Sequence, residues 1–523
     1  MSNRNVQIVW YKRDLRIRDH APLNRAALAG DVLPLYIVEP AILSADDMDA
    51  MHFEFIRDCL ESLRESLTAL GAPLIVKTGE AVAVFESLAQ RFEITAIHCH
   101  EETGNALTFA RDKSVLQWAR ARGIDIHEVP NNGVVRRLGS RDGWASIWAQ
   151  RMHQDPVEPP GDLSAVAIEV DEIPDARSLN LCHLHPAVEK RQQTQIGGEG
   201  AAWQTLESFV AERGHRYQRE ISAPAIARRS CSRLSPYIAY GVLSIRQIVD
   251  YVGRSNFTGR PASAFISRLH WHCHFIQKLE SEPDIEFRCF NPLYETLRGA
   301  PDPKKLIAWQ QGRTGYPFVD ACIRSLQNSG WINFRMRAML TSFAAYDLWL
   351  DWRSFRDFLA RQFIDYEPGI HISQLQMQSG VTGINTPRMY NPVKQGYDHD
   401  PAGEFIREWV PELANVPTLF IHEPWKMSPL EIAETGMQPG THYPMPIVDH
   451  QQAIRHARAA IAKVRNSDAH GSQADAVFVK HGSRKRSGDR QSASAYRQRR
   501  GKGQDGRRFD RPAADHGQLS LFE

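Results

Sequence analysis

Short apolar runs alternate with amphipathic stretches over residues 6–135. The runs VQIVWY, VLPLYIV, PLIVKTG, ITAIHCH and DIHEVPN have the length and composition of strands. Between them, residues 53–71 and 80–92 repeat apolar positions at the i, i+3, i+4, i+7 spacing of a helix, and Gly71 is a suitable C-cap for the first. This alternation predicts an α/β domain over residues 1–135, built on a doubly wound parallel sheet.

The pattern changes after this domain. Residues 136–198 are rich in Pro and acidic side chains, which is typical of a linker that lies over a domain surface. Residues 199–460 repeat apolar and aromatic positions at helical spacing, apart from an irregular stretch at 366–446, and predict an all-α domain. Residues 461–523 are polar, and we expect a disordered basic tail there.

Length and composition agree with two or three domains. Hydrophobic residues make up 42% of the 523 residues, which is enough for a sizeable core. The net charge of +2 conceals an asymmetry, because residues 480–523 contain twelve Lys and Arg against five Asp and Glu. A basic terminal segment serves either to solubilise a protein or to contact nucleic acid, and charge alone does not separate the two.

Cysteine usage indicates the compartment. The seven cysteines are scattered, and no two of them form a Cys-x-x-Cys pair. This favours a reduced compartment and argues against a disulfide framework or a zinc ribbon. The first residues have no apolar signal-peptide core, and no segment reaches eighteen consecutive apolar residues. We therefore expect a cytoplasmic protein without a membrane segment, and a monomer.

Two common nucleotide-binding motifs are missing from the sequence. No G-x-G-x-x-G follows the first predicted strand, and no G-x-x-x-x-G-K-[ST] occurs anywhere. A dinucleotide-dependent dehydrogenase and a P-loop ATPase therefore both lose their main support.

Five stretches carry a more specific signal: WYKRDLRIRDHAPLNRA (10–26), SCSRLSPYIAYGVLS (230–244), WQQGRTGYPFVDACIRSLQNSGWINFRMR (309–337), DLWLDWR (347–353) and NPVKQGYDHDPAGEFIREWVPEL (391–413). In this order they resemble the signature motifs of the photolyase/cryptochrome family of flavin photoenzymes. The resemblance extends over roughly residues 5–450. It implies that the helical domain binds FAD in a bent, U-shaped conformation.

The resemblance assigns the FAD phosphates to the run SCSRLSPY and to a tyrosine upstream of it. Hydroxyl groups and backbone N–H groups ahead of a helix suit an anion. A serine run of this kind also serves as an ordinary helix cap. The residues that inherit the phosphate-binding role are Tyr217, Ser232, Leu234 and Ser235.

Arg337 and Asp365 correspond to a buried pair beside the flavin ring. A fixed guanidinium stabilises an anionic reduced flavin, and the carboxylate accepts a hydrogen bond from the flavin N3–H group. Glu367 stands where many members of the family carry a second Asp. His371 takes the position near flavin N5 at which members often have Asn, Asp or Cys, so we expect His371 to influence the flavin.

The tryptophan chain that feeds electrons to the flavin in this family is incomplete. Leu375 stands in place of the flavin-proximal Trp, and no tryptophan occurs between Trp352 and Trp409. Trp352 matches the middle member of the chain, with Trp349 and Tyr346 at helical spacing. Such a stripe forms either an electron path or plain core, and the missing proximal residue favours core. Photoreduction would then use another route.

The segment SRLHWHCHF (267–275) matches the helix that faces the substrate. Trp271 corresponds to an aromatic residue that stacks on a flipped pyrimidine pair. Arg268 replaces a carboxylate that cyclobutane-dimer photolyases use on the lesion. His270 and His274 have the i, i+4 spacing of a metal pair, but no third ligand is evident, so packing or DNA contact explains them better. We expect no metal.

Two variants of the family are disfavoured. The run WINFRMRA lacks the adjacent histidines of eukaryotic (6-4) photolyases. No cysteine follows Cys322, whereas the bacterial relatives with an iron–sulfur cluster carry its cysteines near the end of the helical domain. We therefore expect no such cluster.

Together these features favour a DNA photolyase, which uses excited reduced FAD to split pyrimidine dimers in UV-damaged DNA. The alternative is a cryptochrome-type blue-light receptor, and a flavoprotein without a role in light is a third interpretation. A second antenna chromophore of the folate or deazaflavin type is compatible with the family. The sequence leaves open the lesion, the antenna, the route of photoreduction and the preference for single- or double-stranded DNA.

The last residues of the chain carry a separate signal. The run QLSLF at 518–522 resembles the short motif by which bacterial DNA polymerases and repair proteins bind the sliding clamp. A polar leader would let the motif reach the groove of the clamp, while its basic residues contact nearby phosphates. A chance apolar terminus is the alternative. The contacting residues would be Gln518, Leu519, Leu521 and Phe522.

Overall fold

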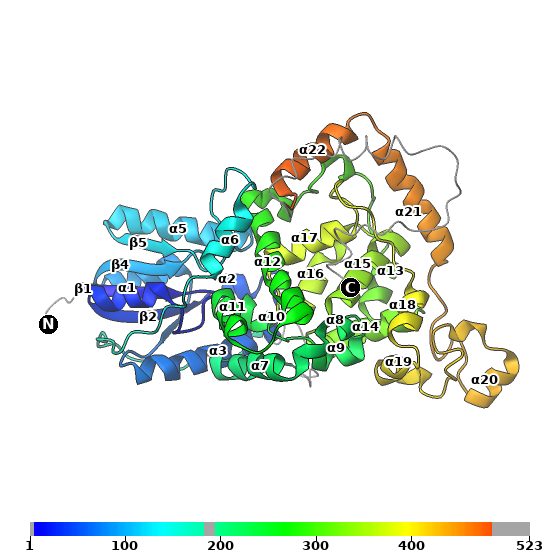
Figure 1. Ribbon diagram of the computed structural model, residues 1–523, viewed down its shortest axis with the longest axis horizontal. Coiled ribbons are helices and arrows are strands. Elements are labelled where there is room, and N and C mark those ends of the chain that lie inside the picture. Colours follow the sequence, from blue (N-terminus) through cyan, green and yellow to red (C-terminus); the bar gives the residue numbers. More distant parts are fainter. Residues whose placement is uncertain (1–4, 182–193, 484–523) are drawn as a thin grey trace.

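The computed structural model describes residues 5–181 and 194–483, and Figure 1 shows two parts. The N-terminal part holds a five-stranded parallel sheet in the order β3-β2-β1-β4-β5. The strands coincide with the five apolar runs, so the predicted parallel sheet is confirmed. Their bounds are Asn5–Tyr11 for β1, Asp31–Val38 for β2, Ile75–Thr78 for β3, Glu93–His100 for β4 and Asp125–Val129 for β5.

Helices cover both faces of the sheet, as alternation along β1 requires. Ile8 and Trp10 point into a cluster that includes residues of α4 and α5, whereas Val9 and Tyr11 point into one that includes residues of α1 and α3. This is the doubly wound arrangement. The helices are α1 (Ala21–Ala29), α2 (Pro40–Leu43), α3 (Ala50–Ala69), α4 (Ala81–Ala89) and α5 (Ala106–Arg122).

The second part is helical, as predicted (Figure 1). Buried residues between 202 and 276 share a core with the sheet domain, and those from 279 onward mostly form a second core. Its helices are α7 (Glu199–Ala211), α8 (Tyr217–Glu220), α9 (Pro224–Ser230), α10 (Ser235–Ala239), α11 (Ile245–Arg254), α12 (Gly259–Ser281), α13 (Pro303–Gln310), α14 (Pro317–Ser329), α15 (Phe334–Ser342), α16 (Trp352–Gln362), α17 (Pro368–Gln378), α18 (Pro392–His399), α19 (Glu404–Trp409), α20 (Pro429–Thr435), α21 (His450–Arg465) and α22 (His470–His481).

The segment between the two parts is more structured than a simple linker. It contains α6 (Trp144–Met152), whose Trp144 and Trp148 rings contact the ring of His270 on α12. Residues after α6 run along the sheet domain, where the N–H of Val32 donates to the carbonyl of Ser164. The composition of residues 136–198 hides this helix because only its two tryptophans and a methionine are buried.

The helical domain extends beyond residue 460, so the predicted start of the tail at 461 is wrong. Helix α21 buries Ile454, Ala457 and Ile461 at the spacing of a helical face, and α22 follows it. These three apolar residues are enough to anchor an otherwise polar helix because they pack on an existing core. Residues 484–523, with the clamp motif, lie outside the described residues.

A partly buried arginine is among the residues that join the two parts. Arg13, just after β1, donates from Nε to the carbonyl of Ala239 at 2.8 Å and from Nη2 to that of Tyr366 at 2.7 Å. The same guanidinium lies 3.3 Å from Glu367.

Within the described ranges, none of the helices combines the length and apolar content that a membrane span requires.

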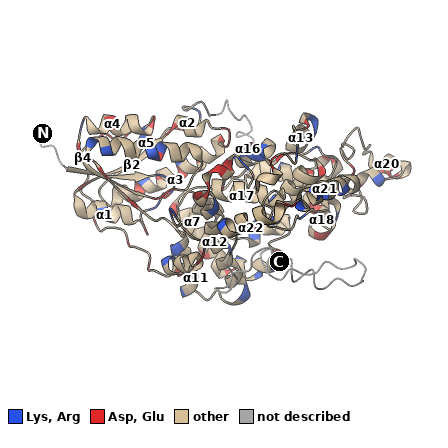
Figure 2. Cartoon of the chain, turned by 90° about the horizontal axis from the view of Figure 1, so that it is seen from above, with Lys and Arg blue, Asp and Glu red and all other residues tan. Residues whose placement is uncertain are grey.

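Acidic and basic residues are interspersed along the helices of both parts (Figure 2).

The sheet domain also contains a buried cluster of one aspartate and two histidines. Asp14 accepts hydrogen bonds from His20 at 2.9 Å and His100 at 2.7 Å, which ties β1, α1 and β4 together. Burial lowers the pKa of both histidines, to about 3 for His100, and they are neutral donors. The three form a hydrogen-bond network in the core.

Candidate functional site

A cavity of about 310 Å³ lies in the helical part, between α8, the turn before α10, α12, α15, α17 and the end of α22. Its size is that of a cofactor or ligand pocket. Nine of the residues singled out from the sequence line it: Tyr217, Ser232, Ser235, Arg268, Trp271, His274, Arg337, Asp365 and Glu367. Residues from five separated segments are therefore brought together.

Three other candidates, Leu234, Trp352 and His371, lie elsewhere. Leu234 is fully buried and does not line the cavity, and its N–H donates to Ser232 Oγ at 3.4 Å. Trp352 is fully buried in the core of the helical part. His371 lines a smaller cavity of about 80 Å³ that shares Arg337 and Asp365 with the large one.

Arg337 and Asp365 form a bidentate ion pair. The two guanidinium Nη atoms lie 2.9 and 2.8 Å from the carboxylate oxygens, and Ser235 donates a further hydrogen bond. Burial would raise the pKa of Asp365, but the charge and hydrogen bonds of Arg337 hold that pKa below its usual value. A fixed anion and a fixed cation therefore stand side by side in the cavity wall.

Four of the side chains that line the large cavity present buried polar atoms for which the described residues offer no hydrogen-bond partner. The atoms are His272 Nδ1, Asn333 Oδ1, Glu367 Oε1 and Gln374 Nε2. Buried polar atoms are normally hydrogen-bonded, so such a set indicates a ligand with both donors and acceptors. FAD, with its ring N–H, its carbonyls and its hydroxyls, has these groups, and the residues present fit it.

Glu367 separates three cavities. Its carboxylate is buried between the large cavity, the small one and a narrow polar pocket beside Arg13. Burial raises the pKa of Glu367, and the nearby charge of Arg13 acts against that rise. The acid replaces the shorter Asp of the family and retains one unpaired oxygen.

Tyr217 and Arg268 form one side of the cavity. The hydroxyl of Tyr217 is hydrogen-bonded to Arg268, and burial raises the pKa of that hydroxyl. Arg268 therefore has a partner within the wall. The turn at Ser232 precedes α10, and Arg233 lies 4.1 Å from the centre of the Trp331 ring. Hydroxyls and guanidinium groups thus gather where the resemblance places the FAD phosphates.

His371 is a neutral residue held by the backbone. Burial lowers the pKa of His371 to about 4, and its Nε2 lies 2.9 Å from the carbonyl of Arg356. Because the carbonyl can only accept, Nε2 carries the proton and Nδ1 is an acceptor. Leu375, one turn later, lines the same small cavity. The space beside His371 is therefore walled partly by apolar side chains such as Leu375 and partly by the charged pair of Arg337 and Asp365.

The aromatic stripe of Tyr346, Trp349 and Trp352 packs in the core of the helical part. Tyr346 and Trp352 are fully buried, and Trp349 contacts His456 at 4.8 Å and Arg298 at 4.6 Å. None of the three lines either cavity. Their packing agrees with a structural role.

Helix α12 presents one continuous face to the large cavity. His270 lies away from it, against two tryptophans, and His274 accepts a hydrogen bond from Arg141. The residues of the cavity face are Arg268, Trp271, His272, His274, Phe275 and Lys278. Sequence reasoning missed Lys278, although its position seven residues after Trp271 would have placed both on one face.

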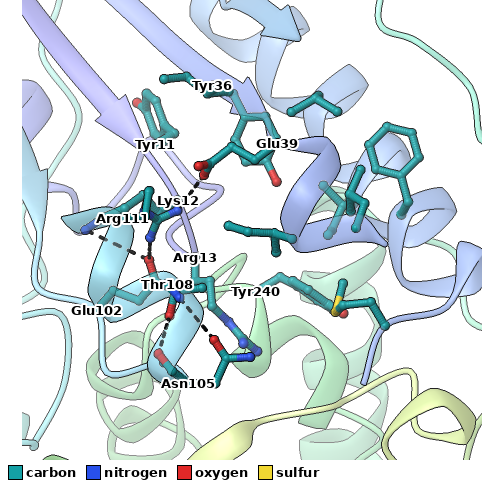
Figure 3. Close-up of a pocket in the computed structure, with 18 of the residues that line it drawn as sticks. Tyr11, Lys12, Arg13, Tyr36, Glu39, Glu102, Asn105, Thr108, Arg111 and Tyr240 are labelled. Carbon is teal, nitrogen blue, oxygen red and sulfur yellow. Dashed lines mark hydrogen bonds and ion pairs between the residues drawn. The ribbon is translucent and has the colours of Figure 1, made fainter. Parts of the chain in front are cut away.

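A second cavity, of about 90 Å³, lies at the carboxyl ends of β1 and β2 (Figure 3). Arg111 of α5 contacts Glu39 at 2.8 Å and Glu102 at 2.6 Å in its wall. Tyr36 and Tyr240 close it, the latter from the helical part. Ligands of doubly wound sheets bind at the carboxyl ends of the strands, so this is the expected edge.

Comparison with known proteins agrees with this geometry. A family model described as DNA photolyase matches residues 7–139, and one described as the FAD binding domain of DNA photolyase matches residues 265–463. The chain is 31% identical over 485 residues to the deoxyribodipyrimidine photo-lyase of Streptomyces griseus, covering 89% of this chain and 100% of the relative. It is 28% identical to the cryptochrome DASH of Gloeobacter violaceus, covering 86% and 94%.

Two solved structures have the same fold. A class III photolyase from Agrobacterium tumefaciens has a TM-score of 0.77 at 25% identity, over 88% of this chain and 98% of that one. An archaeal photolyase from Sulfolobus tokodaii, whose crystal structure contains two FAD molecules, has a TM-score of 0.73 at 24% identity, over 88% and 100%.

Proposed function

Because the chain belongs to the photolyase/cryptochrome family, we propose that it is a light-dependent DNA repair enzyme that splits pyrimidine dimers. The observation that carries the proposal is one cavity with two unlike walls. One wall holds the Arg337–Asp365 pair and the unpaired polar atoms, and the other is the face of α12 with Trp271 and its cationic neighbours.

The residues would divide the work as follows. Arg337 and Asp365 would hold the ring of FAD, and Ser232, Ser235 and Tyr217 would hold its phosphates. Reduced FAD supplies the light-driven electron in this family. Arg337 would stabilise negative charge beside the ring, and Asp365, kept ionised by Arg337, would accept a hydrogen bond from a ring N–H.

Trp271 would receive the substrate. Its indole lies at the cavity and packs against His274 at 4.8 Å and Phe275 at 5.7 Å between ring centres. A flipped pyrimidine pair would stack on this surface, away from water. A site that receives a base in this way favours repair over signalling.

Repair is tested directly with the reduced protein and an oligonucleotide that contains one cyclobutane dimer. Blue light should convert the dimer to intact pyrimidines, and a dark sample should not, as followed by chromatography. A parallel (6-4) substrate identifies the lesion. A protein that binds FAD and photoreduces but converts neither lesion would support the cryptochrome alternative, which relatives such as the Gloeobacter protein represent.

The cavity of Figure 3 would hold a second, light-absorbing cofactor. Its support is the position at the carboxyl ends of β1 and β2, the tyrosines in its walls and the charged residues at its rim. The second FAD of the archaeal neighbour shows that a related fold takes two chromophores. Acid release and chromatography of the purified protein should yield a second pigment besides FAD, and an exclusive yield of FAD at one equivalent would contradict this.

A further inference from the structure

Lys278 is the last residue of the α12 face and the least expected one. It lines the large cavity, yet its side chain is only 6% exposed. It lies seven residues after Trp271, which is about 10 Å along a helix axis on the same face.

The surroundings of Lys278 contain no compensating charge. Among the residues that the structure describes, no carboxylate forms an ion pair with it, and the charge that acts on it is that of Arg141. Its Nζ lies 5.0 Å from the centre of the Phe275 ring and 5.5 Å from that of Phe290. A buried cation of this kind is costly unless an anion joins it.

The neighbours that could have supplied an anion are otherwise engaged. Glu282, just after α12, contacts Lys480 at 3.1 Å and also contacts His481. Its carboxylate is therefore already engaged by these two side chains. His274 accepts a hydrogen bond from Arg141 and cannot act as an anion. The end of α22 lines the same cavity as α12, and these two helices lie close together in the view of Figure 2.

We propose that Lys278 binds a phosphate of the DNA strand that delivers the flipped dimer to Trp271. This rests on the proposed function and extends it to the way in which the site grips its substrate. A phosphodiester supplies the missing negative charge, and a lysine acts on it as a point charge. The other source of phosphate in this cavity is FAD itself, whose phosphates are assigned to the serine turn at residues 232–235.

The titration of Lys278 supports this role. Burial and the charge of Arg141 lower the pKa of Lys278 to about 7 in the free protein. The titratable and charged groups that face it are Arg141 before α6, His274 on the same helix, and His481 on α22 with its partner Glu282 and neighbour Lys480. Binding of a phosphate would raise the pKa of Lys278 again, so affinity should fall as pH rises from 7 to 9.

The experiment measures dark binding of a dimer-containing oligonucleotide by Lys278→Met, Lys278→Arg and the wild type, each loaded with FAD. Lys278→Met should bind about tenfold more weakly, and the slope of log affinity against log salt should fall by about one contact. Lys278→Arg should retain the salt slope and lose the pH dependence, since arginine stays charged. Lys304→Met, at an exposed lysine of α13 outside the cavity, is the matched control and should equal the wild type.

Each other outcome overturns the proposal in its own way. Loss of FAD from Lys278→Met, with normal FAD content in Lys304→Met, would assign Lys278 to the cofactor phosphates. Weaker binding at an unchanged salt slope would indicate a hydrogen bond to a base. Unchanged binding by Lys278→Met would exclude the contact and leave the repair proposal intact, whereas no binding by the wild type would overturn both.

Discussion

Replacing Lys278 with methionine should make the protein more stable, and more so in mild acid than in base. The substitution keeps the length of the side chain and removes a buried charge. A pKa lowered from 10.5 to about 7 means that the unfolded chain binds this proton far more tightly than the folded protein does. The resulting penalty is fully present below pH 7 and disappears above pH 10.5.

The magnitude follows from the size of that pKa difference. Relative to the wild type, Lys278→Met should raise the free energy of unfolding by ~5 kcal/mol at pH 6.5 and by ~1 kcal/mol at pH 9.5. Urea denaturation of the FAD-loaded proteins, followed by tryptophan fluorescence at both pH values, measures the difference. Lys278→Arg is the control, because it keeps the charge and should show no gain.

An equal gain at both pH values would refute the reasoning. It would show that methionine stabilises by packing and that the lysine is not penalised for its charge. A loss of stability at pH 6.5 would show that Lys278 has an anionic partner in the free protein.

Four further predictions concern the cofactor, the aromatic stripe, the histidines and the terminus. Asp365→Ala should leave an arginine uncompensated, cost roughly 3–5 kcal/mol and release FAD; full flavin absorbance after gel filtration would contradict the assigned site. Trp352→Phe should leave the rate of photoreduction nearly unchanged, and a collapse of fast photoreduction in this variant would show that the stripe carries electrons. Stability should fall as pH drops from 6.5 toward 4, by about 2 kcal/mol per buried neutral histidine at pH 5, and a flat urea midpoint over this range would disprove it. The histidines whose pKa burial lowers to about 4 include His98, His272 and His371. A peptide of residues 510–523 should bind a bacterial sliding clamp, and alanine at Leu521 and Phe522 should abolish binding; no binding by the natural peptide at high micromolar concentration would end the clamp hypothesis.

The periodic patterns of the sequence predicted the elements whose structure depends on neighbouring residues in the chain. The five strands follow from their apolar runs, because a buried parallel strand needs little else to be recognised. The limit of the helical domain did not follow, since α21 buries only three residues against a core that is distant in sequence. A polar composition describes the exposed face of such a helix and conceals its buried one.

For the candidate site as well, some residues could be predicted from the sequence and others could not. The motif assigned Arg337 and Asp365, and their bidentate contact agrees with that assignment. It did not separate the small cavity of His371 from the large one, because the wall between them is made by side chains of several elements. Lys278 carried no motif at all, and its isolation becomes visible only when the neighbours on α22 and before α6 are in place.

The contacts of Arg13 also determine geometry between ligands. Its guanidinium lines the cavity of Figure 3, and it touches Glu367, whose carboxylate lines the large cavity. Neither domain can turn against the other without breaking its bonds to the carbonyls of Ala239 and Tyr366. These contacts favour a constant separation and mutual orientation of molecules bound in the two cavities. Transfer of excitation between two chromophores depends on both quantities, so the contacts of Arg13 contribute to how efficiently one could feed the other.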